Sequence, residues 1–311
     1  MIVVAGTGLV GTHAADQLRR RGHEVRSVSH NTVNDVDPVA TDVVLLAHAG
    51  DHVRTAKRFL DAGCHVVSVS DDTKDVLALL DLHGDALAAG RTLIVGAACS
   101  PGLSGLLVSY LGAKFDAFDE VHIAVHGTGG PECARQHHNV LSGTALGWHE
   151  DDWLRRPAGS GRELCWFPDP IGSRDCYRAD LADPLLVKHA FPDVHRISAR
   201  TSATRRDRLT ARLPMLTPPR AGGDMGALRV EVRGVREGQR AVEVAGTAHP
   251  MAHIAGSVAA SAAHEIRRHS HFNTPIAPGV LALGDASLPN NEILDDIMQT
   301  GVRIQAFYGV H

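Results

Sequence analysis

The sequence is poor in aromatic residues, lysine and cysteine, and these shortages narrow the classes of protein it can belong to. Aromatic side chains make up 4% of the 311 residues, and lysine occurs only at positions 57, 74, 114 and 188. A lysine-based mechanism therefore has few candidates. The cysteines are odd in number and never form a Cys-x-x-Cys motif, which argues against a disulfide framework and against a structural zinc site. They are Cys64, Cys99, Cys133, Cys165 and Cys176.

The chain also lacks an excess of positive charge and any long apolar run. Its net charge is −4 with histidine neutral, so no basic field attracts nucleic acid or an anionic membrane. No apolar run approaches the ~20 residues that span a bilayer. The opening MIVVAG has no basic segment and leads into a glycine turn, which is typical of a buried strand and not of a signal peptide. We expect a cytoplasmic protein without a nucleic-acid or membrane partner.

The N-terminal third alternates short apolar runs with helical patterns, which predicts βαβ units and a parallel sheet. The segment 31–41 contains Pro38 and is too short for a full crossover helix. These features predict the doubly wound sheet of a Rossmann-type α/β domain. Strands are expected at 2–5, 25–29, 43–47, 65–69 and 92–97, and helices at 12–21, 52–62 and 75–89, each helix being followed by a glycine.

Beyond Pro101 and Gly102 the pattern changes to that of an inserted α+β second domain. The segment 153–217 is rich in Arg, Pro and Asp and allows no assignment. We predict a Rossmann domain over 1–116, a substrate or dimerisation domain over 117–275, and a return of the chain to the Rossmann domain over 276–311. The elements expected are helices at 103–111, 133–146, 253–268 and 292–300, strands at 119–126 and 280–283, and an antiparallel pair at 227–235 and 241–247.

A complete G-x-G-x-x-G motif lies between the first strand and the first helix. In such a motif the first glycine permits the tight turn and the second lets the backbone approach a pyrophosphate. The third glycine lets the helix pack closely on the strand, while the helix N-terminus provides free N–H groups for the phosphates. The alternative is a tight turn in a fold that has lost its ligand. The motif comprises Gly6, Thr7, Gly8, Leu9, Val10 and Gly11.

The end of the second strand bears on the choice between NADP and NAD. Proteins that bind NAD usually carry an acidic residue there, which holds the ribose 2′-hydroxyl. This chain has Ser29, His30 and Asn31 instead, so a 2′-phosphate meets no repulsion and gains possible donors. We therefore predict NADP as the preferred cofactor, with NAD as the alternative.

The N-terminal domain resembles the saccharopine dehydrogenase-like family of NAD(P)-dependent oxidoreductases. The resemblance rests on GTGLVG at 6–11, on TDVVLLAHAGDHVRTAKRFLDAGCHVVSVSDD at 41–72 and on GAACSPGLSGL at 96–106. It implies a Rossmann domain followed by an α+β substrate domain, and NAD(P)-dependent chemistry at a carbon–nitrogen bond. Ser68 and Ser100 occupy positions where family members often carry Asp, so the substrate does not carry over.

Candidate residues at the carboxyl ends of the strands are those that could face a bound cofactor. Ala47 and His48 follow the third strand, and Ser70 and Asp71 follow the fourth. Asp71 is a candidate acid or base, although either Asp71 or Asp72 could simply cap the next helix. Cys99, after the fifth strand, could be a neutral group beside the nicotinamide.

The second domain contributes a further set of candidates. Gly129 and Gly130 lead into a helix, and together with Arg135 they could bind a substrate carboxylate. His126 and His137 are candidate acid–base groups because histidine titrates near neutrality, although each taken singly is more often structural. Cys133 and His137 have the spacing of two metal ligands on one helix face, but no partner at matching spacing supports them, so no metal is expected.

Together these features predict an NAD(P)-dependent oxidoreductase that transfers a hydride at the carbon–nitrogen bond of a small carboxylate substrate, such as an imine or an amino acid. Two other interpretations remain open: an NADP-binding sensor or scaffold without turnover, and an NADPH-dependent carbonyl reductase. A Tyr-x-x-x-Lys pair would favour the carbonyl reductase. Tyr110 and Lys114 have this spacing, but they lie on a helix after the fifth strand in a Leu-Gly-Ala context, which does not support such a pair. A homodimer is also expected.

Overall fold

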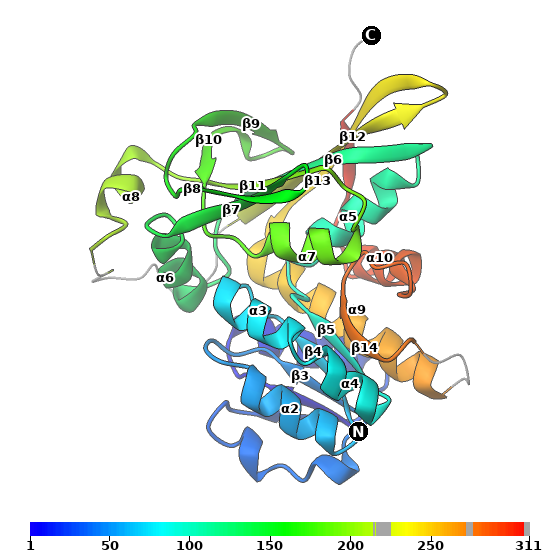
Figure 1. The fold of residues 1–311 in the computed structure, drawn as a ribbon. Helices are drawn as coiled ribbons and strands as arrows, with labels where there is room; N and C mark the ends of the chain where they lie inside the picture. Colours follow the sequence, from blue (N-terminus) through cyan, green and yellow to red (C-terminus); the bar gives the residue numbers. More distant parts are fainter. Residues whose placement is uncertain (214, 216–224, 272–275, 308–311) are drawn as a thin grey trace.

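The computed structural model describes residues 1–213, 215, 225–271 and 276–307. Two sheets form two halves of the molecule, one above the other in Figure 1. The lower half is a six-stranded parallel sheet in the order β14-β5-β4-β3-β1-β2, as the Rossmann prediction requires. Its strands are β1 (Ile2–Ala5), β2 (Val25–Val28), β3 (Val43–Leu46), β4 (His65–Ser68), β5 (Thr92–Val95) and β14 (Gly279–Ala282).

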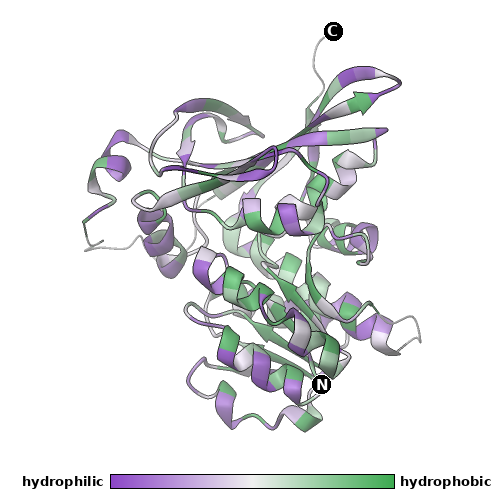
Figure 2. Ribbon diagram, in the orientation of Figure 1, coloured by the Kyte–Doolittle hydropathy of each residue, from purple (hydrophilic) through white to green (hydrophobic). Residues whose placement is uncertain are grey.

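Helices cover both faces of this sheet, because successive strand residues point to opposite sides and both sides are apolar. One face packs against α1 and α9, and the other against α2, α3 and α4. Figure 2 shows apolar residues concentrated in this sheet. Two 3₁₀ turns replace the missing crossover helix between β2 and β3. The helices are α1 (Leu9–Arg20), α2 (Val53–Asp61), α3 (Thr73–Leu80), α4 (His83–Ala89) and α9 (Met251–His271), and the 3₁₀ turns are Val33–Asp35 and Pro38–Ala40.

The upper half is a mixed sheet in the order β15-β13-β12-β6-β11-β10-β9, with β7 and β8 joined to β11. Only the β6–β11 pair is parallel. The predicted hairpin is present as β12 and β13, whose two-residue turn places Glu237 and Gly238 at positive φ of 52° and 75°. The strands are β6 (Ala117–His126), β7 (Thr144–His149), β8 (Asp152–Pro157), β9 (Glu163–Phe167), β10 (Gly172–Arg178), β11 (Arg196–Ser202), β12 (Met225–Arg236), β13 (Gln239–Pro250) and β15 (Gln305–Phe307).

Several expected elements differ in the structure. The helix expected at 75–89 is two helices, α3 and α4. The helix expected at 133–146 ends at Asn139, and 144–149 form β7 because β8 and β11 both offer it a hydrogen-bonding edge. Among its described residues, the unassigned segment 153–217 contains most or all of four strands and two helices. The remaining helices are α5 (Leu103–Gly112), α6 (Pro131–Asn139), α7 (Asp183–Ala190), α8 (Arg205–Thr210) and α10 (Asn290–Gln299).

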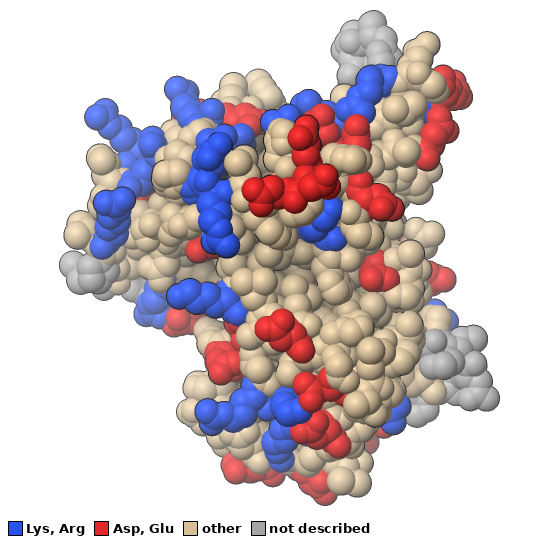
Figure 3. Space-filling view, viewed as in Figure 1, with Lys and Arg blue, Asp and Glu red and all other residues tan. Residues whose placement is uncertain are grey.

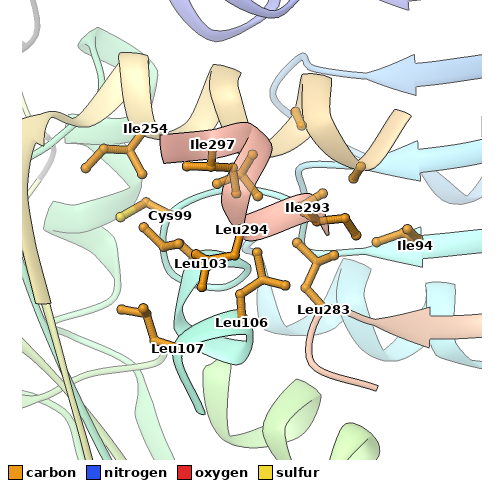
Figure 4. Packing of buried hydrophobic residues seen from close by; sticks show 14 of the residues in the cluster. Ile94, Cys99, Leu103, Leu106, Leu107, Ile254, Leu283, Ile293, Leu294 and Ile297 are labelled. Carbon is orange, nitrogen blue, oxygen red and sulfur yellow. The ribbon is translucent and has the colours of Figure 1, made fainter. Parts of the chain in front are cut away.

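Helix α5 joins the two halves. It contacts β12 and β13 above and α9 and α10 beside it, and nearly all of its residues are buried. Figure 4 shows Leu103, Leu106 and Leu107 of α5 packed among Ile254 of α9 and Ile297 of α10. The floor of any site between the halves is therefore rigidly supported.

Near the end of the chain β14 pairs with β5 of the Rossmann sheet, and then β15 crosses to pair with β13. Helix α9 lies within the predicted second domain but packs against α1, β3 and β4 of the Rossmann half. The boundaries 1–116, 117–275 and 276–311 stay a prediction. Among the described helices, none combines the length and apolar character needed to cross a bilayer.

Candidate functional site

A cleft of about 1340 Å³ lies between the carboxyl edge of the Rossmann sheet and the second domain. This volume exceeds the ~300–1,000 Å³ of an ordinary small-ligand pocket, so it has room for a dinucleotide and a substrate. Gly11, Ser29, Asn31, His126 and His137 do not line it. Fourteen predicted site residues do: Gly6, Thr7, Gly8, Leu9, Val10, His30, Ala47, His48, Ser70, Asp71, Cys99, Gly129, Gly130 and Arg135.

The three glycines of the phosphate turn have three different surroundings. A Cβ at Gly6, where φ is +150°, would collide with the carbonyl oxygen of Ala47, and a Cβ at Gly11 would collide with that of Gly6. A Cβ at Gly8 meets nothing within 4 Å, because this residue faces the open cleft. Gly8 is the N-cap of α1, which has no side-chain cap and no acidic residue in its first turn. The N–H groups at the start of α1 are therefore left for an anion, as dinucleotide binding requires.

Two histidines lie at the nucleotide end of the cleft, beside the point where strand order reverses. His30 follows β2 and His48 follows β3, and their ring centroids are 6.0 Å apart. Nδ1 of His48 is bonded to the carbonyl oxygen of Ala49 at 2.9 Å. Nε2 of His48 is buried and has no hydrogen-bond partner among the described residues. His48 lines the cleft, so this unpaired nitrogen lies close to the space that a ligand would fill.

His52 was missed by the sequence analysis, which assigned it only to the start of a helix. Its ring is fully buried, with Nδ1 bonded to the Ser68 hydroxyl at 2.8 Å and Nε2 to the His48 carbonyl oxygen at 3.0 Å. Burial lowers its pKa to about 4, so the ring is neutral at physiological pH. Ser68 therefore supports a histidine that holds the backbone of His48.

Asp71 and Asp72 separate into two roles. The Asp72 carboxylate caps α3 and accepts hydrogen bonds from the N–H groups of Lys74 and Asp75 at 2.9 and 3.0 Å. Asp71 instead lines the cleft, as does Gln136, whose side chain lies close enough to affect the pKa of the Asp71 carboxyl group. Burial raises the pKa of Asp71 to about 6, although the Gln136 side chain acts in the opposite direction and lowers this pKa. A carboxyl group with this pKa can exchange a proton near neutral pH.

A second carboxyl group, Asp183, lies below the floor of the cleft. It is fully buried at the start of α7 and accepts hydrogen bonds from the hydroxyl groups of Ser100 and Ser104 at 2.7 and 2.6 Å. Burial raises its pKa. Ser100 lines the cleft, so Asp183 fixes the orientation of a cleft hydroxyl. Asp183 was not predicted as a site residue because it lies in 153–217, where the sequence pattern allows no assignment of secondary structure.

The two cysteines of the cleft are poor nucleophiles. Cys99 and Cys133 are largely buried, and burial raises the pKa of both thiols, that of Cys133 to about 11. The neutral, lining character predicted for Cys99 agrees with this environment.

The second domain contributes the wall opposite the phosphate turn. Gly130 is the N-cap of α6 at φ +150°, and a Cβ placed there would lie 3.2 Å from the Leu9 side chain. The starts of α1 and α6 therefore meet at the cleft. Arg135 lies one turn further along α6 and forms an ion pair with Glu132. Gly129, Gly130 and Arg135 thus lie close to the proposed cofactor position, as a substrate-binding wall must.

His126 and His137 are directed elsewhere. On β6 the residues Val121, Ile123 and Val125 belong to the main core, so the alternation turns His126 to the opposite face. Its Nδ1 is bonded there to the Ser202 hydroxyl at 2.7 Å. His137 shares a hydrogen bond of 3.3 Å with the Thr201 hydroxyl, and burial lowers its pKa. Their catalytic roles stay predictions, and the structure brings neither into the lining of the cleft.

The described residues include a group that could hold a metal ion, His264, Glu265 and Asp296. It lies outside the cleft lining. Arg21 already contacts Asp296 at 3.3 Å, and Arg268 contacts Glu265 at 2.7 Å. These cations compensate both carboxylates, so the group is explained as an ion-pair network.

Known structures share this architecture, although no protein-family model and no curated protein sequence matches the chain. Saccharopine dehydrogenase (L-Glu forming) from Saccharomyces cerevisiae superposes with a TM-score of 0.68 at 15% identity, covering 99% of both chains. The chain has the fold of saccharopine dehydrogenase. A meso-diaminopimelate dehydrogenase variant from Clostridium tetani, solved with DAP, gives a TM-score of 0.54 at 12% identity over 94% of this chain and 95% of that chain. An engineered D-amino acid dehydrogenase bound to NADP+ gives 0.50 at 13% identity over 96% and 98%. The fold predicted from the family resemblance, a Rossmann domain with an α+β second domain, is confirmed.

Proposed function

We propose that this protein is an NAD(P)-dependent oxidoreductase acting at the carbon–nitrogen bond of a small carboxylate substrate, an imine or an amino acid. The observation that carries the proposal is the meeting, in one cleft, of the phosphate turn and a half-buried carboxyl group, Asp71, with a pKa of about 6. The fold shared with amino acid dehydrogenases supports the reaction class by analogy.

The cofactor end of the cleft favours NADP over NAD. The phosphate turn can hold a pyrophosphate, since Gly8 is open to the cleft and α1 is uncapped. No carboxylate follows β2, where Ser29, His30 and Asn31 stand, and His30 lines the cleft. A 2′-phosphate would meet a potential donor there and no repulsion.

A bound nicotinamide would supply or accept the hydride. The protein's own task is to hold the substrate and to move one proton. In the oxidative direction the ionised Asp71 would accept a proton from the substrate nitrogen, and in the reductive direction the protonated Asp71 would return it. Gln136 would orient the carboxyl group, and the Ser100 hydroxyl, fixed by Asp183, would present a polar group on the floor.

The substrate carboxylate would bind at the start of α6. Gly129 and Gly130 present backbone to the cleft there, and Arg135 would exchange its Glu132 partner for the incoming carboxylate. His126 and His137 have no part in this scheme.

The two alternatives make different predictions. In the sensor interpretation NADP binds without turnover. The carbonyl reductase interpretation has no support from Tyr110 and Lys114, because neither lines the cleft and Lys114 instead pairs with Glu243 at 3.1 Å. A homodimer and a cytoplasmic location stay predictions.

The test is a turnover screen of purified protein with NADPH or NADH, using imines and mixtures of keto acids with amines, followed at 340 nm. The proposal predicts oxidation of NADPH that needs both the keto acid and the amine, and that Asp71→Asn abolishes. Cofactor binding without turnover across the screen would favour the sensor. Reduction of ketones without an amine would favour the carbonyl reductase.

A further inference from the structure

A second hollow, separate from the cleft, opens on the outer face of the second sheet. This is the face turned away from α5 and α9, because Ile197 and Ala199 of β11 point to the core and Ser198 alternates with them. The hollow has a volume of about 210 Å³. Its floor is low because the neighbouring strands carry small residues, Ala145 and Gly147 on β7 and Ser198 on β11.

Arginines surround this floor, and we call the site the arginine groove. Glu163 is the one carboxylate among its lining residues. Figure 3 shows Lys and Arg side chains gathered on this part of the second domain, over α8 and the strands β7–β10. Its arginines are Arg156, Arg178, Arg196, Arg200 and Arg233.

The positive charge of the groove is only partly compensated. Arg200 pairs with Glu163 at 2.6 Å and Arg233 pairs with Glu231 at 2.6 Å, while Arg196 lies 3.8 Å from Glu120. No carboxylate within the described part of the chain reaches salt-bridge distance of the other two arginines, Arg156 and Arg178.

Two of these arginines are held against each other by the sheet register. Arg178 on β10 lies directly opposite Arg200 on β11. Like charges at such a pair of positions destabilise a sheet. The pKa of Arg178 is lowered by burial first, and then by the neighbouring Arg200 and Arg156. The folded chain thus contains a repulsion that a bound anion would relieve.

We propose that the arginine groove binds a small, multiply charged oxyanion, the phosphate or polycarboxylate part of a metabolite. Guanidinium groups bind both oxyanions through paired N–H···O hydrogen bonds, and Arg156, Arg178 and Arg200 all line the groove, with Arg178 and Arg200 at paired positions of β10 and β11. The small volume fits one such group and not a polymer surface. The groove lies on the opposite face of the sheet from the core and shares no lining residue with the cleft, so its occupant binds independently of the cofactor and substrate.

The test is calorimetric titration at low salt with two probes, inorganic pyrophosphate and citrate, which separate the phosphate and polycarboxylate sources. The titrations use protein carrying Gly8→Asp, which adds a negative charge at the phosphate turn and removes that turn as a competing anion site. We expect one saturable site per chain for at least one probe, weakened by added salt. Arg178→Ala should weaken binding by about tenfold or more, and Arg178→Lys by less. Arg174→Ala is the matched control, because Arg174 is an exposed arginine of the same strand outside the groove, and it should change nothing.

Affinity for both probes weaker than about 1 mM would overturn the proposal, as would binding that Arg178→Ala leaves unchanged. If Arg178→Ala does not fold, Arg156→Ala replaces it, since Arg156 is exposed. Sedimentation of the same variants separates a further outcome. Loss of self-association in Arg178→Ala without anion binding to the parent protein would mean that acidic groups of a second copy fill the groove, which also overturns the proposal.

Discussion

In the Asp71→Asn variant, an amide of nearly the same shape takes the place of a carboxyl group that burial holds at a pKa of about 6. The amide keeps the shape and polarity of the carboxyl group but cannot exchange a proton. Removing a general acid–base group typically lowers kcat by about 10²- to 10⁴-fold, and we expect a loss of this size. The wild-type rate of substrate oxidation should also fall as the pH drops below about 6, because protonated Asp71 cannot accept a proton.

The same substitution should make the protein more stable at neutral and alkaline pH. The pKa of Asp71 rises from 3.8 in the unfolded chain to about 6 in the folded one, so the ionised group destabilises the folded state. At about 1.36 kcal/mol per pKa unit, the cost reaches up to about 3 kcal/mol above pH 6. It disappears below pH 3.8, where the group is protonated in both states. Asp71→Asn should therefore raise the free energy of unfolding at pH 8 and leave it unchanged near pH 3.5.

Urea unfolding at several pH values, together with steady-state kinetics, measures both effects. Asp72→Ala, at the adjacent position, is the control. Loss of its helix cap should lower the free energy of unfolding by about 0.5–2 kcal/mol, whereas Asp71→Asn should raise it. An Asp71→Asn protein that is less stable than wild type at pH 8, or that keeps full activity, would refute the role given to Asp71.

Three further predictions concern the turn, the cofactor and the core. Gly11→Ala should destabilise the protein and abolish NADPH binding, because its Cβ would collide with the Gly6 carbonyl oxygen, whereas Gly8→Ala should fold normally. Thermal unfolding and titration with NADPH distinguish the two variants. His30→Glu, which restores an acid after β2, should weaken NADPH binding relative to NADH by about tenfold in parallel titrations; an unchanged ratio would contradict the NADP preference. Leu106→Ala should lower the free energy of urea unfolding by about 2–5 kcal/mol, because this side chain is 1% exposed between α9 and α10. A loss well below 1 kcal/mol would show that α5 does not join the two halves as described.

The Rossmann half was predictable because its local signals agree with its tertiary structure. Fully buried parallel strands give continuous apolar runs, and Gly22, Gly63 and Gly90 follow the helices at positive φ of 80°, 79° and 62°. The second domain was harder because the polarity of its residues does not separate the buried face of a strand from the exposed one. In β9 the buried residues Cys165 and Phe167 alternate with exposed Leu164 and Trp166, so polar and apolar residues do not alternate along this strand.

The site was predictable where residues follow strand ends, since topology brings those ends together. Asp71 and His48 were predicted in this way, and both line the cleft, but their surroundings depend on residues of α6 and α2. The orientation of His126 could also have been predicted from the sequence. The apolar residues Val121, Ile123 and Val125 already fix which face of β6 is buried, and they place His126 on the other.

The most direct test of the account is calorimetric titration of the wild-type protein and the Gly8→Asp variant with NADPH and NADH. The account predicts one saturable NADPH site per chain, weaker binding of NADH, and loss of both in Gly8→Asp while the fold is retained, since a Cβ at Gly8 enters open space. Failure of the wild-type protein to bind either cofactor, or unchanged binding in Gly8→Asp, would contradict the assignment of the cleft as a dinucleotide site.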